Sequence, residues 1–338
     1  MSVENKKNKN LPQIISLFCG AGGLDLGFVQ AGYKVALAID YEMAAINTHR
    51  KNFNTTKSLQ CDLTVLGPEG VLKLVRKELR KGSRIGLIGG PPCQGFSRSN
   101  PSSDVDDPRN LLPLLYVNII QELQKVYHVE FVVFENVLGM KDKKHASKYK
   151  SLILGLKRLH FDVTEKELCA LDYGVPQKRN RIIISAMRSQ QGYGEVVPAK
   201  TTGQTTVREA IGALTEPTFF NRSLTAKDIP FHPNHWTMNP KSKKFSDPSL
   251  QTNGNRSFRK LAWDKAAPTI AFGNREIHLH PDGRRRLSIY EAMLLQGFPT
   301  NFVLEGNFSQ QVLQISNAVP PPLAFSVANA VANSMNFK

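Results

Sequence analysis

Short apolar runs alternate with amphipathic stretches from residue 13 to about residue 187, and this alternation constrains the fold more than any other feature. Four runs read as strands buried on both faces, because they are apolar without a two-residue alternation. They are IISLF (14–18), KVALAI (34–39), RIGLIG (84–89) and EFVVF (130–134). Helical periodicity separates them, at 24–30, 43–52, 71–80 and 110–126. This order predicts parallel βαβ units in a doubly wound α/β sheet.

The texture changes after about residue 188, where Gly, Pro, Asn, Thr and Ser become frequent and long apolar runs stop. Residues 190–280 hold 12 Lys and Arg against 7 Asp and Glu, a net charge of +5. Order returns in RRLSIYEAMLLQGFP (285–299), where Ser288 and Glu291 have the spacing of a helix capping box. A last apolar helix is expected at 323–335. We therefore predict a first domain at 11–187, a smaller loop-rich domain at 188–283, and a return to the first domain at 284–338.

The charge and the cysteines restrict the class of protein. The formal net charge of +16 favours a polyanionic partner, although a generally basic protein explains the charge alone equally well. The four cysteines form no CxxC pair, so we expect no structural metal site, and their scatter is typical of reduced, cytoplasmic proteins. The polar N-terminus predicts no signal peptide, and no segment reads as a membrane span.

Three features of the predicted sheet could hold a ligand. In FCGAGG (18–23) a strand runs into a glycine turn and then a helix, which allows close backbone approach and offers free amides. Its G-x-G-G spacing does not meet the dinucleotide fingerprint, and a tight turn without ligand explains it as well. Asp40 and Asp62 each follow a predicted strand. Each could bind ribose hydroxyls or simply cap the following helix.

Three further features could carry chemistry. In GGPPCQGFS (89–97), Cys93 is either a small core residue or a nucleophile. Glu135 ends a very apolar strand and could be a structural acid paired with an arginine, or a carboxyl that binds or moves a proton. In VPQKRNRIIIS (175–185), the alternate residues Gln177, Arg179 and Arg181 would share one face of an extended chain.

Geometry predicts that most of these residues meet. Open α/β sheets bind ligands at the carboxyl ends of their strands, where the glycine turn, Asp40, Asp62, Cys93 and Glu135 should gather. The arginine run instead precedes its strand. It reaches the same edge only if 164–171 and 181–185 form an antiparallel pair at the end of the sheet, which we predict.

Taken in order, these motifs resemble those of the DNA (cytosine-5) methyltransferases that use S-adenosylmethionine, and the likeness covers nearly the whole chain. The matching stretches are FCGAGG, PPCQGFS, ENV (135–137), QKRNR (177–181), RRLSIYEAMLLQGFP and SNAVPPPLA (316–324). Two positions depart from the family pattern: Ser16 stands where an acid is frequent, and Ser316 where glycine usually precedes Asn317. We expect these departures to change cofactor affinity slightly.

The resemblance implies a Rossmann-like methyltransferase sheet with an antiparallel hairpin at one end, plus a loop-rich target-recognition domain. It implies that the Cys93 thiolate attacks carbon 6 of a flipped-out cytosine, that Glu135 holds the ring, and that Arg181, together with Arg179, grips its carbonyl and a phosphate. The cofactor, S-adenosylmethionine, would contact Phe18, Gly20, Gly22, Gly23, Asp40, Tyr41, Asp62, Asn317 and Val319.

The resemblance also implies double-stranded DNA as partner. The expected DNA contacts are Gln94, Ser97, Gln177, Lys241, Lys243, Lys244, Arg256, Arg259 and Lys260. Residues 241–260 carry six basic side chains and one acid, which a solvated loop would also explain. A stand-alone chain of this size fits the monomeric modification enzyme of a prokaryotic restriction–modification system, nucleoid-associated when acting, with a cognate endonuclease for the same site.

Three other functions compete with this interpretation. An RNA-directed cytosine methyltransferase would share the chemistry, but the substantial recognition segment and the PPCQGFS loop favour DNA. A DNA-binding relative without catalysis is disfavoured because Cys93, Glu135 and Arg181 are all present. A nucleotide-dependent oxidoreductase lacks its fingerprint and has no use for the PPCQ loop.

Overall fold

The computed structural model describes residues 11–92, 111–203, 205–247, 259–269 and 278–335. The chain divides into two compact units. The first unit comprises Met1–Leu168, Asn180–Ala199 and Ala324–Lys338, and the second comprises Cys169–Arg179 and Lys200–Leu323. The chain therefore returns to the first unit at Ala324, later than the predicted 284. The reason lies in pairings inside the second unit, such as the ion pair of Arg285 with Glu216.

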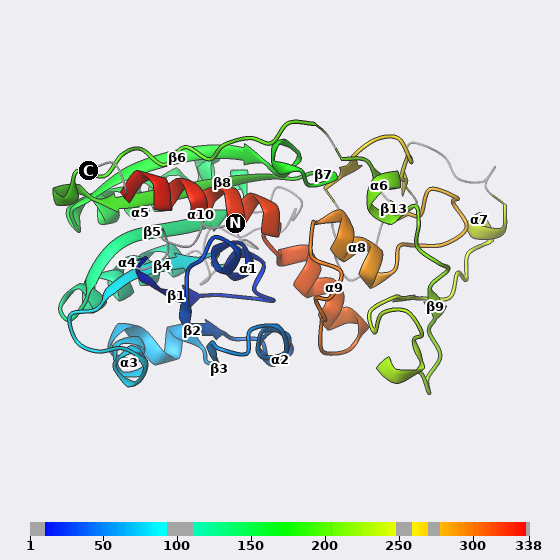
Figure 1. The fold of residues 1–338 in the computed structure, drawn as a ribbon, viewed down its shortest axis with the longest axis horizontal. Coiled ribbons are helices and arrows are strands. Elements are labelled where there is room, and N and C mark those ends of the chain that lie inside the picture. The colour runs from blue at the N-terminus through cyan, green and yellow to red at the C-terminus, as the bar shows by residue number, and fades with distance from the viewer. Residues whose placement is uncertain (1–10, 93–110, 204, 248–258, 270–277, 336–338) are drawn as a thin grey trace, which may run out of the picture. The chain divides into compact units, whose positions relative to one another are not determined.

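A seven-stranded sheet organises the first unit, in the order β3-β2-β1-β4-β5-β8-β6 (Figure 1). Its first five strands are parallel, and β8 runs antiparallel to β5. The predicted α/β sheet is thus confirmed. The strands are β1 (Gln13–Leu17), β2 (Val35–Asp40), β3 (Lys57–Gln60), β4 (Arg84–Gly89), β5 (His128–Asn136), β6 (Phe161–Cys169) and β8 (Asn180–Arg188).

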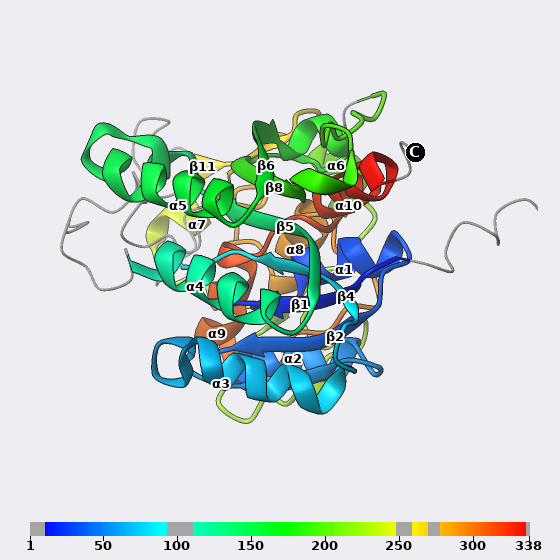
Figure 2. The same ribbon diagram turned by 90° about the vertical axis from the view of Figure 1, so that its left-hand side faces the viewer.

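Helices cover both faces of this sheet, as a doubly wound fold requires. Buried side chains of α3 (Leu63–Glu78), α4 (Leu112–Gln124) and α5 (Ala146–Arg158) share one core with alternate residues of the strands. On the other face, Phe28 of α1 (Gly23–Gln30) stacks on Phe131 of β5 with ring centroids 6.1 Å apart. The last helix, α10 (Pro321–Met335), packs so closely on α1 that a Cβ at Gly27 would lie 2.4 Å from Ala324 Cβ. Figure 2 shows these helices from the side.

The helix boundaries follow local signals in the sequence. The prediction for α2 (Met43–Asn52) is confirmed at both ends. By contrast, α3 begins at Leu63, eight residues before the predicted 71, because Asp62 caps it. A kink at Gly67, which has φ 65°, precedes Pro68 and divides this helix. The sequence pattern predicted only the part after the kink.

The predicted antiparallel pair at the end of the sheet is confirmed. Strand β8 lies between β5 and β6. Within the first unit, the Ser189 amide donates to the His160 carbonyl at 3.0 Å, and within the second, the Ala170 amide donates to the Arg179 carbonyl at 2.9 Å. The partners move in opposite directions along the two strands, which is the mark of an antiparallel pair.

The second unit is rich in loops and has short elements, as its Gly and Pro content predicts. Helix α8 (Ile289–Leu295) begins with the capping box of Ser288 and Glu291, which confirms that prediction. No helix in the described part of the chain has the length and hydropathy to cross a membrane. The other regular elements of this unit are β7 (Gln177–Lys178), α6 (Val207–Ile211), β9 (Thr218–Phe219), β10 (Trp236–Thr237), α7 (Lys243–Ser246), β11 (Arg259–Lys260), β12 (Ala267–Pro268), β13 (His278–Leu279) and α9 (Phe308–Asn317).

Candidate active site

The glycine turn lies between β1 and α1 and leaves its backbone open on one side. Phe18, Gly20 and Gly22 all have positive φ, at 55°, 54° and 86°. A Cβ at Gly22 would lie 2.5 Å from the Phe53 ring, so only glycine fits there. A Cβ at Gly20 would meet nothing within 4 Å. The turn therefore packs against Phe53 at Gly22, whereas its backbone at Gly20 is accessible to a ligand.

Asp40, the last residue of β2, holds this turn. Its Oδ2 accepts a hydrogen bond from the Gly20 amide at 2.8 Å, and its Oδ1 accepts one from the Glu42 amide at 2.9 Å. Burial raises the pKa of this carboxyl, and the two amides partly oppose that rise. The next residue, Tyr41, is 63% exposed. An acid and an exposed aromatic ring thus stand beside the glycine turn.

Asp62 caps α3, which was one of its two predicted roles. Its Oδ1 accepts hydrogen bonds from the Thr64 amide at 2.8 Å and from the Thr64 hydroxyl at 2.6 Å. These bonds lower the pKa of Asp62 and keep it ionised. The carboxylate retains acceptor capacity in Oδ2, so capping leaves the second role open. The Cys61 amide donates to the Asp40 carbonyl, which places Asp62 next to the end of β2.

Glu135 and Arg181 form an ion pair where the carboxyl end of β5 meets the start of β8. Arg181 Nε lies 2.7 Å from Glu135 Oε1, with side chains 11% and 8% exposed. The two residues come from the neighbouring antiparallel strands β5 and β8. Of the two roles predicted for Glu135, the pairing with an arginine is therefore present. Its place at the carboxyl end of β5 also satisfies the geometry that the second role requires.

The chain that leads to Cys93 passes directly against Glu135. A Cβ at Gly90 would lie 2.7 Å from Glu135 Oε2, so glycine permits this approach. The Asn136 side-chain amide donates to the Pro91 carbonyl at 3.2 Å. These contacts fix the start of the cysteine loop beside the carboxylate. Cys93, Gln94 and Ser97 themselves lie outside the described residues.

Arg179 and Gln177 are buried inside the second unit. Arg179 is 1% exposed, and its Nη2 donates to the carbonyls of Ser316 and Ala318 at 2.6 and 2.9 Å. Gln177 is fully buried, with its side-chain nitrogen 3.5 Å from the Leu295 carbonyl. These contacts favour structural roles, so neither residue is included among the cytosine and DNA contacts proposed below. The alternation of the motif could not reveal them, because their partners lie more than a hundred residues away.

The final motif is fixed in the second unit by Arg179. The two carbonyls that Arg179 binds belong to the neighbours of Asn317 on either side. Asn317 is exposed at the end of α9, and Val319 is 7% exposed. Arg179 thus orders the backbone that presents both residues.

The basic segment of the second unit presents charge at its surface. Lys241 and Lys243 are exposed, and Lys244 is partly exposed. Arg259 and Lys260 are exposed on β11. Arg256 lies outside the described residues.

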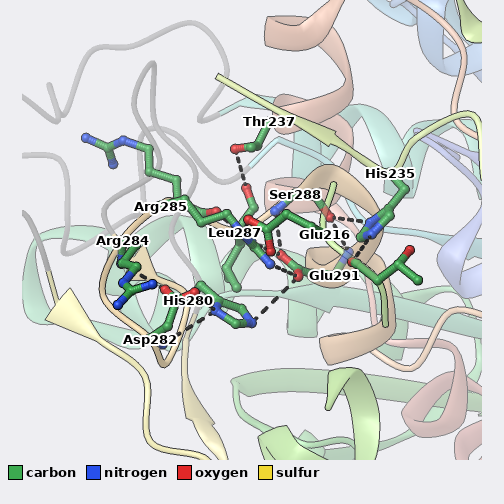
Figure 3. A network of polar contacts seen from close by, with 12 residues as sticks. Glu216, His235, Thr237, His280, Asp282, Arg284, Arg285, Leu287, Ser288 and Glu291 are labelled. Carbon is green, nitrogen blue, oxygen red and sulfur yellow. Dashed lines mark hydrogen bonds and ion pairs between the residues drawn. The ribbon is translucent and has the colours of Figure 1, made fainter. Parts of the chain in front are cut away.

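A buried ion cluster within the second unit, which the sequence pattern does not reveal, links segments that are distant in the sequence (Figure 3). Arg285 is 3% exposed and donates from Nη1 and Nη2 to both oxygens of Glu291, at 2.9 and 2.8 Å. Its Nε pairs with Glu216 at 2.8 Å. Glu291 also accepts the Ser288 amide of the capping box, so one carboxylate serves the helix cap and the ion pair. The only sequence signal for this cluster was that Glu291, a capping residue, follows Arg285 by six positions.

The first unit has groups that suit an adenosyl cofactor. The Gly20 backbone is open, Asp40 and Asp62 offer carboxylate oxygens, and Tyr41 offers an exposed ring. They lie on the adjacent parallel strand ends of β1, β2 and β3, which is the position predicted from the sequence. This donor set fits a nucleoside with ribose hydroxyls and an exocyclic amine.

Comparison with known proteins gives a consistent family. Residues 12–333 match the model of the C-5 cytosine-specific DNA methylases. The chain is 30% identical to the Type II methyltransferase M.MthTI of Methanothermobacter thermautotrophicus, covering 95% of this chain and 97% of that protein. It is 32% identical to the Type II methyltransferase M1.HphI of Haemophilus parahaemolyticus, with 94% and 86% covered.

A solved structure shares the fold. It is that of a protein from an E. coli prophage described as a DNA modification methyltransferase, with a TM-score of 0.77, 24% identity, and coverage of 96% of this chain and 100% of that one. The sheet, the order of the motifs and these similarities agree. The chain belongs to the C-5 cytosine-specific DNA methylase family and is a DNA cytosine-5 methyltransferase whose methyl donor is S-adenosylmethionine.

Proposed function

We propose that this enzyme methylates carbon 5 of one cytosine within a specific duplex sequence, as the modification component of a Type II restriction–modification system. The names of the relatives from M. thermautotrophicus and H. parahaemolyticus support this role. A cognate endonuclease would recognise the same site without being bound to this chain. The enzyme would act on DNA as a monomer in a prokaryotic cytoplasm.

The reaction requires the target base outside the helix. Carbons 5 and 6 of a stacked cytosine cannot be reached by a side chain and a cofactor together, so the nucleotide must be flipped out. The observation that carries the proposal is the buried pair of Glu135 and Arg181, against which the chain toward Cys93 is packed. A carboxylate, a guanidinium and a cysteine loop at one sheet edge are the groups that an extruded cytosine needs.

Cys93 would begin the chemistry as a thiolate. Its sulfur forms a bond to carbon 6, and the electron pair of the carbon 5–carbon 6 double bond moves into the ring. Glu135, when protonated, would donate a hydrogen bond to ring nitrogen 3, where the electron pair arrives, and accept one from the amino group. Arg181 would hold the Glu135 carboxylate in place and donate to the cytosine carbonyl. Carbon 5, now nucleophilic, can accept a methyl group.

S-Adenosylmethionine, when bound, would supply that methyl group as an electrophile, with the electron pair of the broken carbon–sulfur bond remaining on its sulfur as a thioether. A base, in our proposal a water molecule, then removes the proton from carbon 5. The electron pair of that carbon–hydrogen bond restores the double bond, and the sulfur of Cys93 leaves as thiolate. The enzyme is thereby returned to its starting state.

The residues at the other strand ends would bind the donor. Asp40 would accept from the ribose hydroxyls, Tyr41 would stack near the adenine, and Asp62 would accept from the adenine amino group. The open backbone at Gly20, with Phe18, Gly22 and Gly23, would admit the methionine end. Asn317 and Val319 are proposed as further cofactor contacts, and Arg179 would position them through the carbonyls it binds.

The second unit would read the target sequence. Its exposed cations would neutralise phosphates, and other side chains of this unit would contact base edges. The cations proposed for this role are Lys241, Lys243, Lys244, Arg256, Arg259 and Lys260. Gln94 and Ser97 would contact DNA near the flipped base.

Trapping with duplex DNA that carries 5-fluorocytosine tests the chemistry. Fluorine at carbon 5 cannot leave as a proton does, so a covalent complex should accumulate with the wild-type enzyme and S-adenosylmethionine. Cys93→Ser should form none, whereas Cys61→Ser, which changes a different cysteine, should form it normally. An adduct that persists in Cys93→Ser would show that another residue is the nucleophile.

A further inference from the structure

Three buried side chains of the first unit form a chain of polar contacts that the reaction above does not use. His49 Nε2 lies 3.2 Å from Asp25 Oδ1, and His49 Nδ1 lies 2.8 Å from Ser58 Oγ. Asp25 and His49 are fully buried, and Ser58 is 4% exposed. Groups this deeply buried are costly to keep in a core unless they are paired. The burial of these three polar side chains therefore needs a structural or functional reason.

The three residues lie on three different elements of the first unit, α1, α2 and β3, which Figure 1 labels. Asp25 lies in the first turn of α1, directly after the glycine turn. His49 lies on α2, the helix that follows Asp40 and Tyr41. Ser58 lies on β3, the strand that leads to Asp62. The imidazole thus connects the three segments that carry the proposed cofactor contacts.

His49 also supports the glycine turn directly. Its ring stacks on Phe53 with centroids 4.1 Å apart and an interplanar angle of 21°. A Cβ at Gly22 would lie 2.5 Å from the Phe53 ring and 3.0 Å from His49 Cδ2. The rings of Phe53 and His49 therefore pack directly against the glycine turn at Gly22. A shift of the imidazole would move the turn.

We propose that His49 is a positioning residue that sets the spacing of the glycine turn, Asp40 and Asp62, and thereby the affinity for S-adenosylmethionine. This inference rests on the proposed cofactor contacts. Asp25 fixes the imidazole: its Oδ1 contacts Nε2, while its Oδ2 has no hydrogen-bond partner among the described residues. His49 is thus the side chain that satisfies this buried carboxylate. Removing the imidazole takes away the partner of Asp25 Oδ1 and the packing of the His49 ring against Gly22 and Phe53.

Calorimetry of S-adenosylmethionine binding to the full-length enzyme tests the proposal, with DNA binding measured on the same samples. His49→Phe keeps a ring but no nitrogen and should weaken cofactor binding about 10-fold, with the DNA dissociation constant changed less than about 2-fold. His49→Gln can still donate to Asp25 and should recover most of the affinity. Ser58→Ala, a milder change, should weaken binding a few-fold, and it serves as the test if His49→Phe does not fold.

His145→Phe is the matched control. His145 is also a fully buried histidine of the first unit, but it lies on a segment without a proposed cofactor contact. The proposal is overturned if His49→Phe and Ser58→Ala bind the cofactor like the wild type, or if His145→Phe weakens binding equally. Asp40→Ala separates this failure from failure of the proposed site. If Asp40→Ala still binds normally, the cofactor assignment itself is wrong.

Discussion

Arg181 Nε lies 2.7 Å from the Glu135 carboxylate across two antiparallel strands, with both side chains close to nine-tenths buried. Burying two charges costs desolvation energy that their attraction offsets only in part. Such a pair is therefore a poor device for stability alone. Its position beside Gly90 and Pro91, at the base of the cysteine loop, fits the role in cytosine binding proposed above.

The pair predicts that stability and activity separate in a double-mutant cycle. Arg181→Met removes the guanidinium that pairs with the buried Glu135 carboxylate and should lower the free energy of unfolding by about 3 kcal/mol. Adding Glu135→Gln removes that charge and should restore most of the stability, measured by urea denaturation. Methyl transfer should stay about 100-fold or more below wild type in the double variant. Activity that returns together with stability would mean that the pair is structural.

Substitution of Arg179 should affect stability and cofactor binding more than the chemistry, because its guanidinium binds two backbone carbonyls. Arg179→Lys keeps the charge but loses the planar fork that reaches both Ser316 and Ala318. We expect a loss of about 1–3 kcal/mol in unfolding free energy and weaker cofactor binding. Trapping by 5-fluorocytosine at saturating S-adenosylmethionine should stay within about 10-fold of wild type. Complete loss of the adduct in a folded variant would instead indicate that Arg179 contacts the cytosine.

Asp40 predicts that cofactor affinity falls on acidification. Burial raises the pKa of this carboxyl, so it takes up a proton at a higher pH than an ordinary aspartate. The protonated form loses acceptor capacity that the Gly20 amide uses and that the proposed ribose contact requires. Binding should therefore be full above the raised pKa and weaken as the pH falls through it, as calorimetry over a pH series would show. Asp40→Asn should bind weakly with little pH dependence, and a wild-type affinity constant down to acidic pH contradicts this role.

Because His232 is buried, we expect the stability of the second unit to fall at acidic pH. Burial lowers the pKa of His232 from 6.5 to about 4, and its ring stacks on Tyr290 at 4.0 Å. The unfolded chain therefore binds a proton below pH 6.5 that the folded chain takes up only near pH 4. Stability is full above pH 6.5 and is lost as the pH falls through that window, by roughly 2–3 kcal/mol. His232→Phe should remove this part of the pH dependence in thermal unfolding, and an unchanged profile would contradict the assignment.

The sequence predicted those features whose cause is local. The apolar runs identified β1, β2, β4 and β5, and the Ser288 and Glu291 spacing identified the start of α8, because strand burial and capping depend on near neighbours. Pairings between distant segments stayed hidden. Asp25 and His49 read as ordinary helix residues, and Arg285 gave no sign of its bond to Glu216. Both networks depend on how separate elements meet, which no periodicity encodes.

The basic segment 241–260 predicts a measurable part of the salt dependence of DNA binding. Lys241 and Lys243 are exposed and Lys244 is partly exposed, in a unit proposed to contact phosphates. Each phosphate contact contributes about −0.9 to the slope of log K against log salt concentration. Changing all three lysines to glutamine should therefore reduce the slope by about two to three. Filter binding or fluorescence anisotropy over a salt series measures it.

A charge-matched control decides between contact and general charge. Lys73, Lys77 and Arg80 are exposed on or just after α3 of the first unit, and replacing them removes the same net charge. If the lysines of the second unit contact phosphates, only their replacement changes the slope, because counterion release depends on proximity to DNA. An equal effect of both triple variants would mean that residues 241–244 are a solvated segment that contributes only overall charge.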